Sequence, residues 1–155
     1  MRFTATVGSI THYSGPLDYA IVRIQRPSQP LTSRVFPCLL NTVGYQQAVQ
    51  RRAQAVLVAR SRSNQRLRAH QRNTLSLLPA RIVTKPCVDD MLCLQLHNAH
   101  AQYNRTVYDS SELPVFVKVG TSRWALAGFG DVKRYGNVLS TPLHGLINWA
   151  YRHVR

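Results

Sequence analysis

The loop from 108 to 115 holds the residues of this chain that are best suited to covalent chemistry. Its order is Tyr-Asp-Ser-Ser-Glu-Leu-Pro-Val, with Ser110 and Ser111 after Asp109 and an apolar strand pattern after Pro114. A serine on such a loop acts as a nucleophile when a base and an oxyanion hole are arranged around it. A Ser-Ser pair before a strand is also ordinary turn chemistry, so the loop alone leaves both interpretations open.

A second acid, Asp18, stands at the mouth of an apolar strand expected over 17–24. A buried carboxylate needs a partner, because an unpaired buried charge is costly. Asp18 would either cap nearby backbone N–H groups or orient a histidine. The chain has six histidines, at His12, His70, His97, His100, His144 and His153. They have no ligand spacing with the cysteines, so we expect neither a metal site nor a cofactor.

Positive charge dominates the chain. The net charge is +14, 17 of the 20 basic residues are arginine, and no acidic residue lies between 19 and 88. Such a charge attracts polyanions such as nucleic acid or heparin-like glycans, although it is equally typical of a solvated surface. The densest segment supplies seven candidate polyanion-binding residues, Arg51, Arg52, Arg60, Arg62, Arg66, Arg68 and Arg72.

Length and composition indicate one globular domain with its own core. The chain has 155 residues, of which 45% are hydrophobic. No apolar run approaches the roughly 20 residues that span a bilayer, so no membrane span is expected. The first residues lead into a strand pattern and do not resemble a signal peptide.

The three cysteines are unevenly placed. Cys87 and Cys93 are close enough in sequence for a disulfide that closes a short loop, whereas Cys38 is distant from both. An odd count in an oxidising compartment leaves one thiol free or paired with another chain. Asn104 begins an Asn-Arg-Thr glycosylation sequon, which is meaningful only in a secreted protein.

Many short strands and one terminal helix are expected to position these residues. Alternating or β-branched patterns predict strands over 3–13, 17–24, 53–59, 74–84, 115–119, 124–129 and 138–139. Polar segments over 44–52, 60–72, 97–106 and 130–136 are expected to be loops. Helical spacing over 141–151, with Thr141 as N-cap and Pro142 at the first position, predicts a C-terminal helix. This pattern favours an all-β barrel against which the helix packs.

Taken in order, these segments resemble the chymotrypsin/trypsin-like serine proteases over nearly the whole chain. Leu-Asp-Tyr-Ala-Ile-Val-Arg-Ile at 17–24 is similar to that family's aspartate strand, and Val-Phe-Pro-Cys-Leu-Leu at 35–40 to its interdomain segment. Asp-Ser at 109–110 with Pro-Val at 114–115 resembles the nucleophile loop. Gly-Asn-Val-Leu-Ser-Thr-Pro-Leu at 136–143, followed by a helix containing Trp149, resembles the end of these enzymes.

The resemblance implies a chymotrypsin-like double β-barrel with a C-terminal helix. Residues 1–40 would be the remainder of the first barrel and the interdomain segment, 41–140 the complete second barrel, and 141–155 the helix. Asp18 and Ser110 would match the catalytic aspartate and serine. Cys87 and Cys93 would match a disulfide pair of the second barrel. Cys38 would match a cysteine that is often bonded to a separate N-terminal segment.

Departures from the family pattern argue against catalysis. The triad mechanism needs a histidine that takes the serine proton, and no histidine of this chain matches the catalytic position. Tyr108 stands where the family has an oxyanion-hole glycine, and Ser111 and Glu112 replace the two glycines after the serine. The extra residue before Pro114 leaves either Ser110 or Ser111 as the nucleophile equivalent. Thr106 lies near the position of a missing pocket cysteine.

Three functions therefore remain open. The first is a catalytically inactive protease homologue that serves as a protein-binding or structural module, in the extracellular space or secretory pathway. The second is one chain of a cleaved or split serine endopeptidase, whose partner supplies strands and a histidine and is disulfide-linked through Cys38. The third is a basic protein that binds nucleic acid or another polyanion, or associates with a capsid.

Overall fold

The chain folds as two compact units. The computed structural model describes residues 6–15, 19–25, 37–60, 75–85, 87–97, 109 and 111–154. One unit comprises Cys38–Gly145, and the other joins Met1–Pro37 with Leu146–Arg155.

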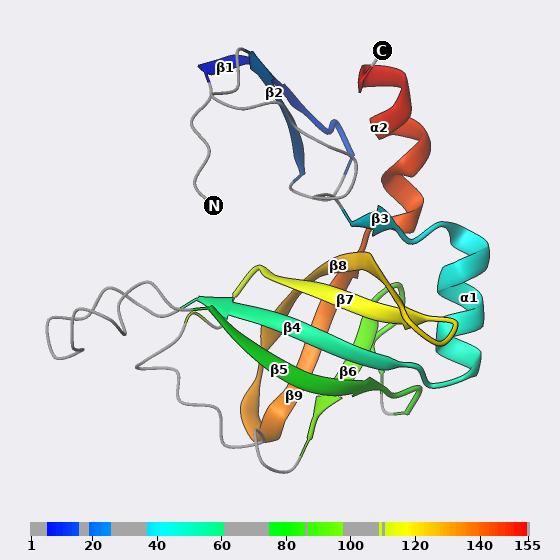
Figure 1. Cartoon of the computed structure of the whole chain (residues 1–155). Helices are drawn as coiled ribbons and strands as arrows, with labels where there is room; N and C mark the ends of the chain where they lie inside the picture. Colours follow the sequence, from blue (N-terminus) through cyan, green and yellow to red (C-terminus); the bar gives the residue numbers. More distant parts are fainter. Residues whose placement is uncertain are drawn as a thin grey trace, which may run out of the picture. The chain divides into compact units, whose positions relative to one another are not determined.

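The larger unit contains a closed antiparallel barrel of six strands (Figure 1). Hydrogen bonds link the strands in the order β8-β7-β4-β5-β6-β9, and β9 pairs again with β8 to close the barrel. A short strand, β3, runs parallel to β8 beside the barrel. The all-β barrel with a C-terminal helix that the sequence predicts is thus confirmed. The strands of this unit are β3 Cys38–Leu39, β4 Gln54–Arg60, β5 Leu75–Ile82, β6 Leu92–Leu96, β7 Leu113–Val119, β8 Arg123–Val132 and β9 Asn137–Pro142.

Alternating side chains explain why these segments form barrel strands. In β4 the small or apolar residues Ala55, Leu57 and Ala59 are buried, while the residues between them are more exposed. Period-2 burial places one side of each strand in the barrel interior and the other outside. β7 follows the same rule, with Leu113, Val115 and Val117 buried.

The connections follow a Greek-key order. β4, β5 and β6 form a meander, and β7 then returns to pair with β4. β7 and β8 form a hairpin whose turn contains Gly120 at φ 65°. β8 extends through Val132, so the start of the loop predicted over 130–136 belongs to the strand.

The prediction of a loop over 44–52 is wrong, because Thr42–Gln50 forms helix α1. The side chain of Asn41 caps this helix by accepting a hydrogen bond from the Gly44 N–H at 2.8 Å. Ala48 is buried against the core, and Tyr45 and Val49 pack there as well. Few apolar residues face inward from α1, so the sequence gives a weak helical pattern over this segment.

The expected start of the C-terminal helix is also wrong. Thr141 and Pro142 end strand β9, where Pro142 pairs with Gly128 and Thr141 with Phe129. Pairing with β8 therefore overrides the capping signal. A single 3-10 turn, η5, covers His144–Leu146, and helix α2 then spans Ile147–Val154.

The smaller unit consists of a two-stranded hairpin and α2. β1, Thr6–His12, and β2, Ala20–Gln25, lie within or close to the strands predicted over 3–13 and 17–24, and they pair antiparallel. The guanidinium of Arg23 donates to the carbonyl of His153 at 3.1 Å. The rings of Tyr13 and Trp149 meet edge to face with centroids 5.0 Å apart. Within this unit, α2 is therefore tied to the hairpin.

Candidate functional site

The described part of the serine loop is held between two barrel strands. The N–H of Asp109 donates to the carbonyl of Arg60, the last residue of β4, at 2.9 Å. The N–H of Glu112 donates to Oδ1 of Asp131 in β8, also at 2.9 Å. Asp131 in turn pairs with Lys133 at 3.8 Å on the surface. The loop is thus fixed at both ends of the Ser-Ser pair.

Glu112 has a left-handed backbone, with φ at 57°. Glycine is the residue that adopts this conformation without cost, and a glycine is what the family resemblance implies at this point. The chain therefore has a positive φ here with a glutamate side chain. Ser110, Tyr108 and Asp18 lie outside the described residues, so the predicted catalytic pair is not placed.

Two described histidines, His144 and His153, have ring contacts that involve no described residue of the serine loop. His144 stacks on Tyr45 of α1, with ring centroids 4.1 Å apart, and its Nδ1 lies 3.3 Å from Thr42 Oγ1. Burial lowers the pKa of His144 below its ordinary value. His153 has its Nδ1 2.8 Å from the carbonyl of Trp149 in the preceding turn of α2.

The remaining histidines add little to a catalytic assignment. His12 is an exposed residue of β1, as expected, and His97 is exposed directly after β6. His70 and His100 lie outside the described residues. In the described part of the chain, no three His, Cys, Asp or Glu side chains gather in a way that would hold a metal ion.

The predicted arginine segment is split by strand β4. Arg51 and Arg52 are exposed at the C-terminal end of α1, whereas Arg60 is exposed at the far end of β4. A seven-residue strand separates these ends by roughly 20 Å. Arg62, Arg66, Arg68 and Arg72 lie outside the described residues.

Instead, the fold brings Arg52 together with two cations that sequence reasoning missed. A cleft of about 450 Å3 is lined by Arg52, Arg81 and Lys85, with Gln95 on its polar side. We call this the basic cleft; Ile82, Val83 and Thr84 complete its lining. Its cations come from two separate stretches of sequence, Arg52 from one and Arg81 with Lys85 from the other, so only the fold could have revealed the cluster.

A second hollow lies between α1 and the connection from β5 to β6. It measures about 550 Å3, and Tyr45, Val49, Ile82 and Met91 are among its lining residues. Burial, followed by the negative charge of Asp90, raises the pKa of Tyr45. The phenol therefore stays protonated and presents a neutral hydroxyl to this hollow.

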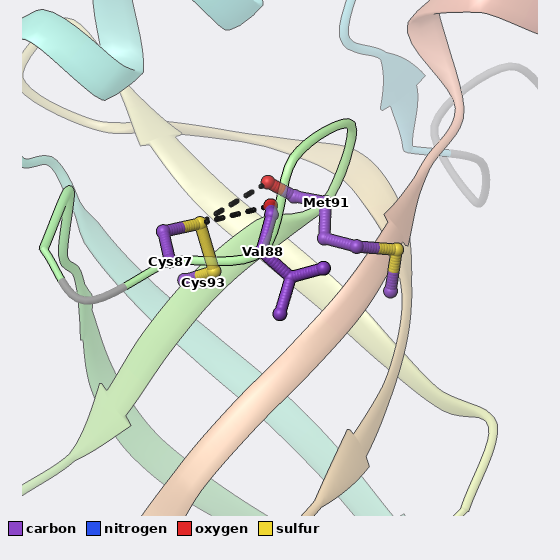
Figure 2. The surroundings of a disulfide bond; sticks show 4 residues. All are labelled: Cys87, Val88, Met91 and Cys93. Atoms are coloured by element: carbon purple, nitrogen blue, oxygen red, sulfur yellow. Dashed lines mark hydrogen bonds between the residues drawn. A yellow bond between two sulfur atoms is a disulfide. The ribbon is translucent and has the colours of Figure 1, made fainter.

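The disulfide between Cys87 and Cys93 is confirmed (Figure 2). It closes the connection that carries Met91, whose side chain extends away from the sulfur atoms. Sγ of Cys87 lies 3.4 Å from the Val88 carbonyl oxygen and 3.5 Å from that of Met91. A disulfide sulfur carries no proton, so these are close sulfur–oxygen contacts. Cys38 is a free, exposed thiol, and Asn104 lies outside the described residues.

Comparison with protein-family models and with curated proteins yields no match. Among the helices of the described residues, none is long and apolar enough to cross a membrane.

Proposed function

We propose that this chain is a catalytically inactive homologue of the chymotrypsin/trypsin-like proteases that acts as a protein-binding or structural module outside the cytoplasm. A complete six-stranded barrel over 54–142 supports the proposal, because the family resemblance implies a full second barrel there. The disulfide supports an oxidising compartment, in which such bonds persist.

The observation that carries the proposal is the contact between Glu112 and Asp131. A working nucleophile loop needs a base near the serine and free N–H groups for the oxyanion. In the described loop the Glu112 N–H donates to the Asp131 carboxylate, which anchors the backbone directly after the Ser-Ser pair. The Asp109 N–H is likewise committed to the Arg60 carbonyl, so two backbone donors of this loop are not open to an oxyanion.

The histidines support the same conclusion. His144 is engaged by Tyr45 and Thr42, and His153 by the backbone of α2. Both rings thus have partners within their own units, and neither of these contacts involves a described residue of the serine loop. Loss of the base removes most of the rate enhancement of a serine protease, leaving only about 10³–10⁴-fold over water in the well-studied enzymes.

The test is chemical labelling of the purified, folded protein. A fluorophosphonate probe and a panel of fluorogenic peptides should give no covalent adduct and no turnover, with trypsin run in parallel as the active control. Ser110→Ala and Ser111→Ala variants serve as matched blanks. An adduct on the wild type that disappears in Ser110→Ala, or in Ser111→Ala, overturns the proposal.

A second candidate function is favoured by the hairpin of the smaller unit. Val7, Ile10, Val22 and Ile24 are about half exposed, at 55, 55, 50 and 47%. A two-stranded hairpin is marginal by itself and leaves both edges unpaired. We propose that strands from a second protein segment pair with this hairpin. If that segment also supplies a histidine, the chain is one part of a split endopeptidase.

Cys38 offers the covalent link for such a partner, because its thiol is free and exposed. Mass spectrometry of protein isolated without reductant separates the two candidates. A mixed disulfide at Cys38 that reductant releases supports a covalent partner. A free Cys38 thiol in a monomer contradicts the covalent partner and leaves the inactive module.

A further inference from the structure

Three outward-facing polar residues form a row across the barrel. Strand pairing places Arg81 of β5 opposite Gln54 of β4 on one side and opposite Gln95 of β6 on the other. Ala80 and Ile82, which flank Arg81 in sequence, are buried. Because side chains alternate along a strand, Arg81 and its two partners lie on the outer surface of the barrel.

Two depressions meet at this row. The basic cleft of about 450 Å3 contains Arg52, Arg81, Lys85 and Gln95. An adjoining hollow of about 400 Å3 shares Arg81 and Gln95 and adds Gln54 and His97. No acidic residue lines either depression among the described residues. The neighbours of Arg81 across the sheet are therefore amides, where a carboxylate would be the usual stabilising partner for a cation.

Arg52 occupies a backbone position that usually belongs to glycine. α1 ends with the N–H of Arg52 bonded to the Val49 carbonyl and the N–H of Ala53 bonded to the Ala48 carbonyl. This is the Schellman pattern, in which the left-handed residue is most often glycine. Arg52 adopts it with φ at 48°. The chain thus places a cation beside Arg81 and Lys85 at a cost in backbone free energy.

A bound anion accounts for this arrangement. Three cations that share one cleft repel each other, and a ligand with negative groups relieves that repulsion. Arginine presents planar donors that suit sulfate or phosphate oxygens. Asp89 and Asp90 lie on the same connection as Lys85 but do not line the cleft.

We propose that the basic cleft binds the sulfate groups of a sulfated polysaccharide. The connection that carries Lys85 also carries the Cys87–Cys93 disulfide. Disulfides persist in oxidising, mainly extracellular surroundings, where sulfated glycans are the abundant polyanions and nucleic acid is scarce. The inference goes beyond the proposed function: it rests on the location outside the cytoplasm that is proposed there, but it is independent of any catalytic loss.

The first experiment measures binding of a fluorescent heparin octasaccharide as the salt concentration rises. Arg81→Gln with Lys85→Gln should lower affinity roughly tenfold at about 0.1 M salt. The slope of log affinity against log salt should fall by about two. The matched control is Arg123→Gln with Arg134→Gln, which removes the same charge from exposed positions outside the cleft. The control should bind almost as the wild type does.

A second variant separates binding from stability. Arg52→Gly restores the residue that the Schellman position favours, so it should raise Tm by about 2–4 °C. It should also weaken heparin binding several-fold, because one cleft cation is lost. If Arg52 had only a structural role, Arg52→Gly would not weaken heparin binding. A higher Tm together with a lower heparin affinity therefore identifies a ligand-binding role for Arg52.

Three outcomes overturn the proposal. The control pair may weaken binding as much as the cleft pair does, which would show that only total charge matters. Replacement of the four arginines at 62, 66, 68 and 72 by glutamine may abolish binding while the cleft pair has no effect. Finally, a single-stranded DNA or RNA of equal charge may bind more tightly than heparin at the same salt, which would identify a nucleic-acid site.

Discussion

The imidazole of His144 stacks on the phenol ring of Tyr45, with centroids 4.1 Å apart and ring planes inclined by 25°. The contact joins α1 to the η5 turn within the larger unit, and Thr42 adds a polar contact of 3.3 Å to the same imidazole. Partial burial favours a neutral imidazole over a charged one that must be hydrated. His144 therefore adds to the core packing that holds α1, the helix that the sequence did not reveal.

Stability should fall in mild acid because of His144. Burial lowers its pKa, so in the pH range just below the ordinary value of about 6.5 the unfolded chain binds more protons than the folded one. The stabilisation is complete above about pH 6.5 and is lost as the pH falls toward the lowered, folded-state pKa. His144→Phe keeps a ring against Tyr45 but cannot titrate. Between pH 7.5 and pH 5.0, the Tm of the wild type should fall more than the Tm of His144→Phe. Equal falls would show that His144 is not the group responsible for the loss of stability in acid.

The anchor of the serine loop gives a second prediction. Asp131→Ala removes the acceptor of the Glu112 N–H and should cost about 1–2 kcal/mol in urea unfolding. Asp131→Asn keeps an oxygen acceptor and should cost less. Lys133→Ala removes only a 3.8 Å surface ion pair, so its effect should stay below about 0.5 kcal/mol. Should Lys133→Ala prove as costly as Asp131→Ala, the ion pair and not the hydrogen bond would hold the loop.

Local pattern was enough to predict five of the six barrel strands, but it missed β6, the helix α1 and the cleft. β4 and β7 have period-2 burial that is already visible in their residues, and a strand needs little more to be recognised. α1 has few inward apolar residues, and its clearest signal is the capping Asn41.

Longer-range effects account for the other differences. Thr141 and Pro142 carry a helix-start signal, yet pairing of β9 with β8 decides their conformation. Arg52, Arg81 and Gln95 are separated by tens of residues, and they meet only because β4, β5 and β6 pair in one register. A chain-wide charge excess could suggest an anion site, but only that register could locate it.

The disulfide should stabilise the larger unit by a modest amount. Its cysteines are six positions apart, and loop-closure entropy for such a short loop predicts about 2 kcal/mol. Cys87→Ser with Cys93→Ser should lower the free energy of unfolding by that amount, as should reduction of the wild type. Cys38→Ser is the control, because that thiol is free and exposed, and it should change stability by less than about 0.5 kcal/mol. If the double variant unfolds in one cooperative transition with the same free energy of unfolding as the wild type, the prediction is contradicted.

β8 and β9 approach each other closely at Gly128, so among the glycines of these two paired strands Gly128 should tolerate substitution least. A Cβ at this position would lie 2.2 Å from the Thr141 carbonyl oxygen and 2.7 Å from the buried Ser140 hydroxyl. The carbonyl belongs to backbone, so relief requires the two paired strands to separate. Gly128→Ala should therefore cost about 3 kcal/mol. A Cβ at Gly145 meets nothing within 4 Å, so Gly145→Ala is the matched control and should be nearly neutral. Chemical denaturation of both variants checks the prediction. A mild effect at Gly128 would mean that the strands part easily here, and the closure of the barrel between β8 and β9 would then be weaker than its pairing indicates.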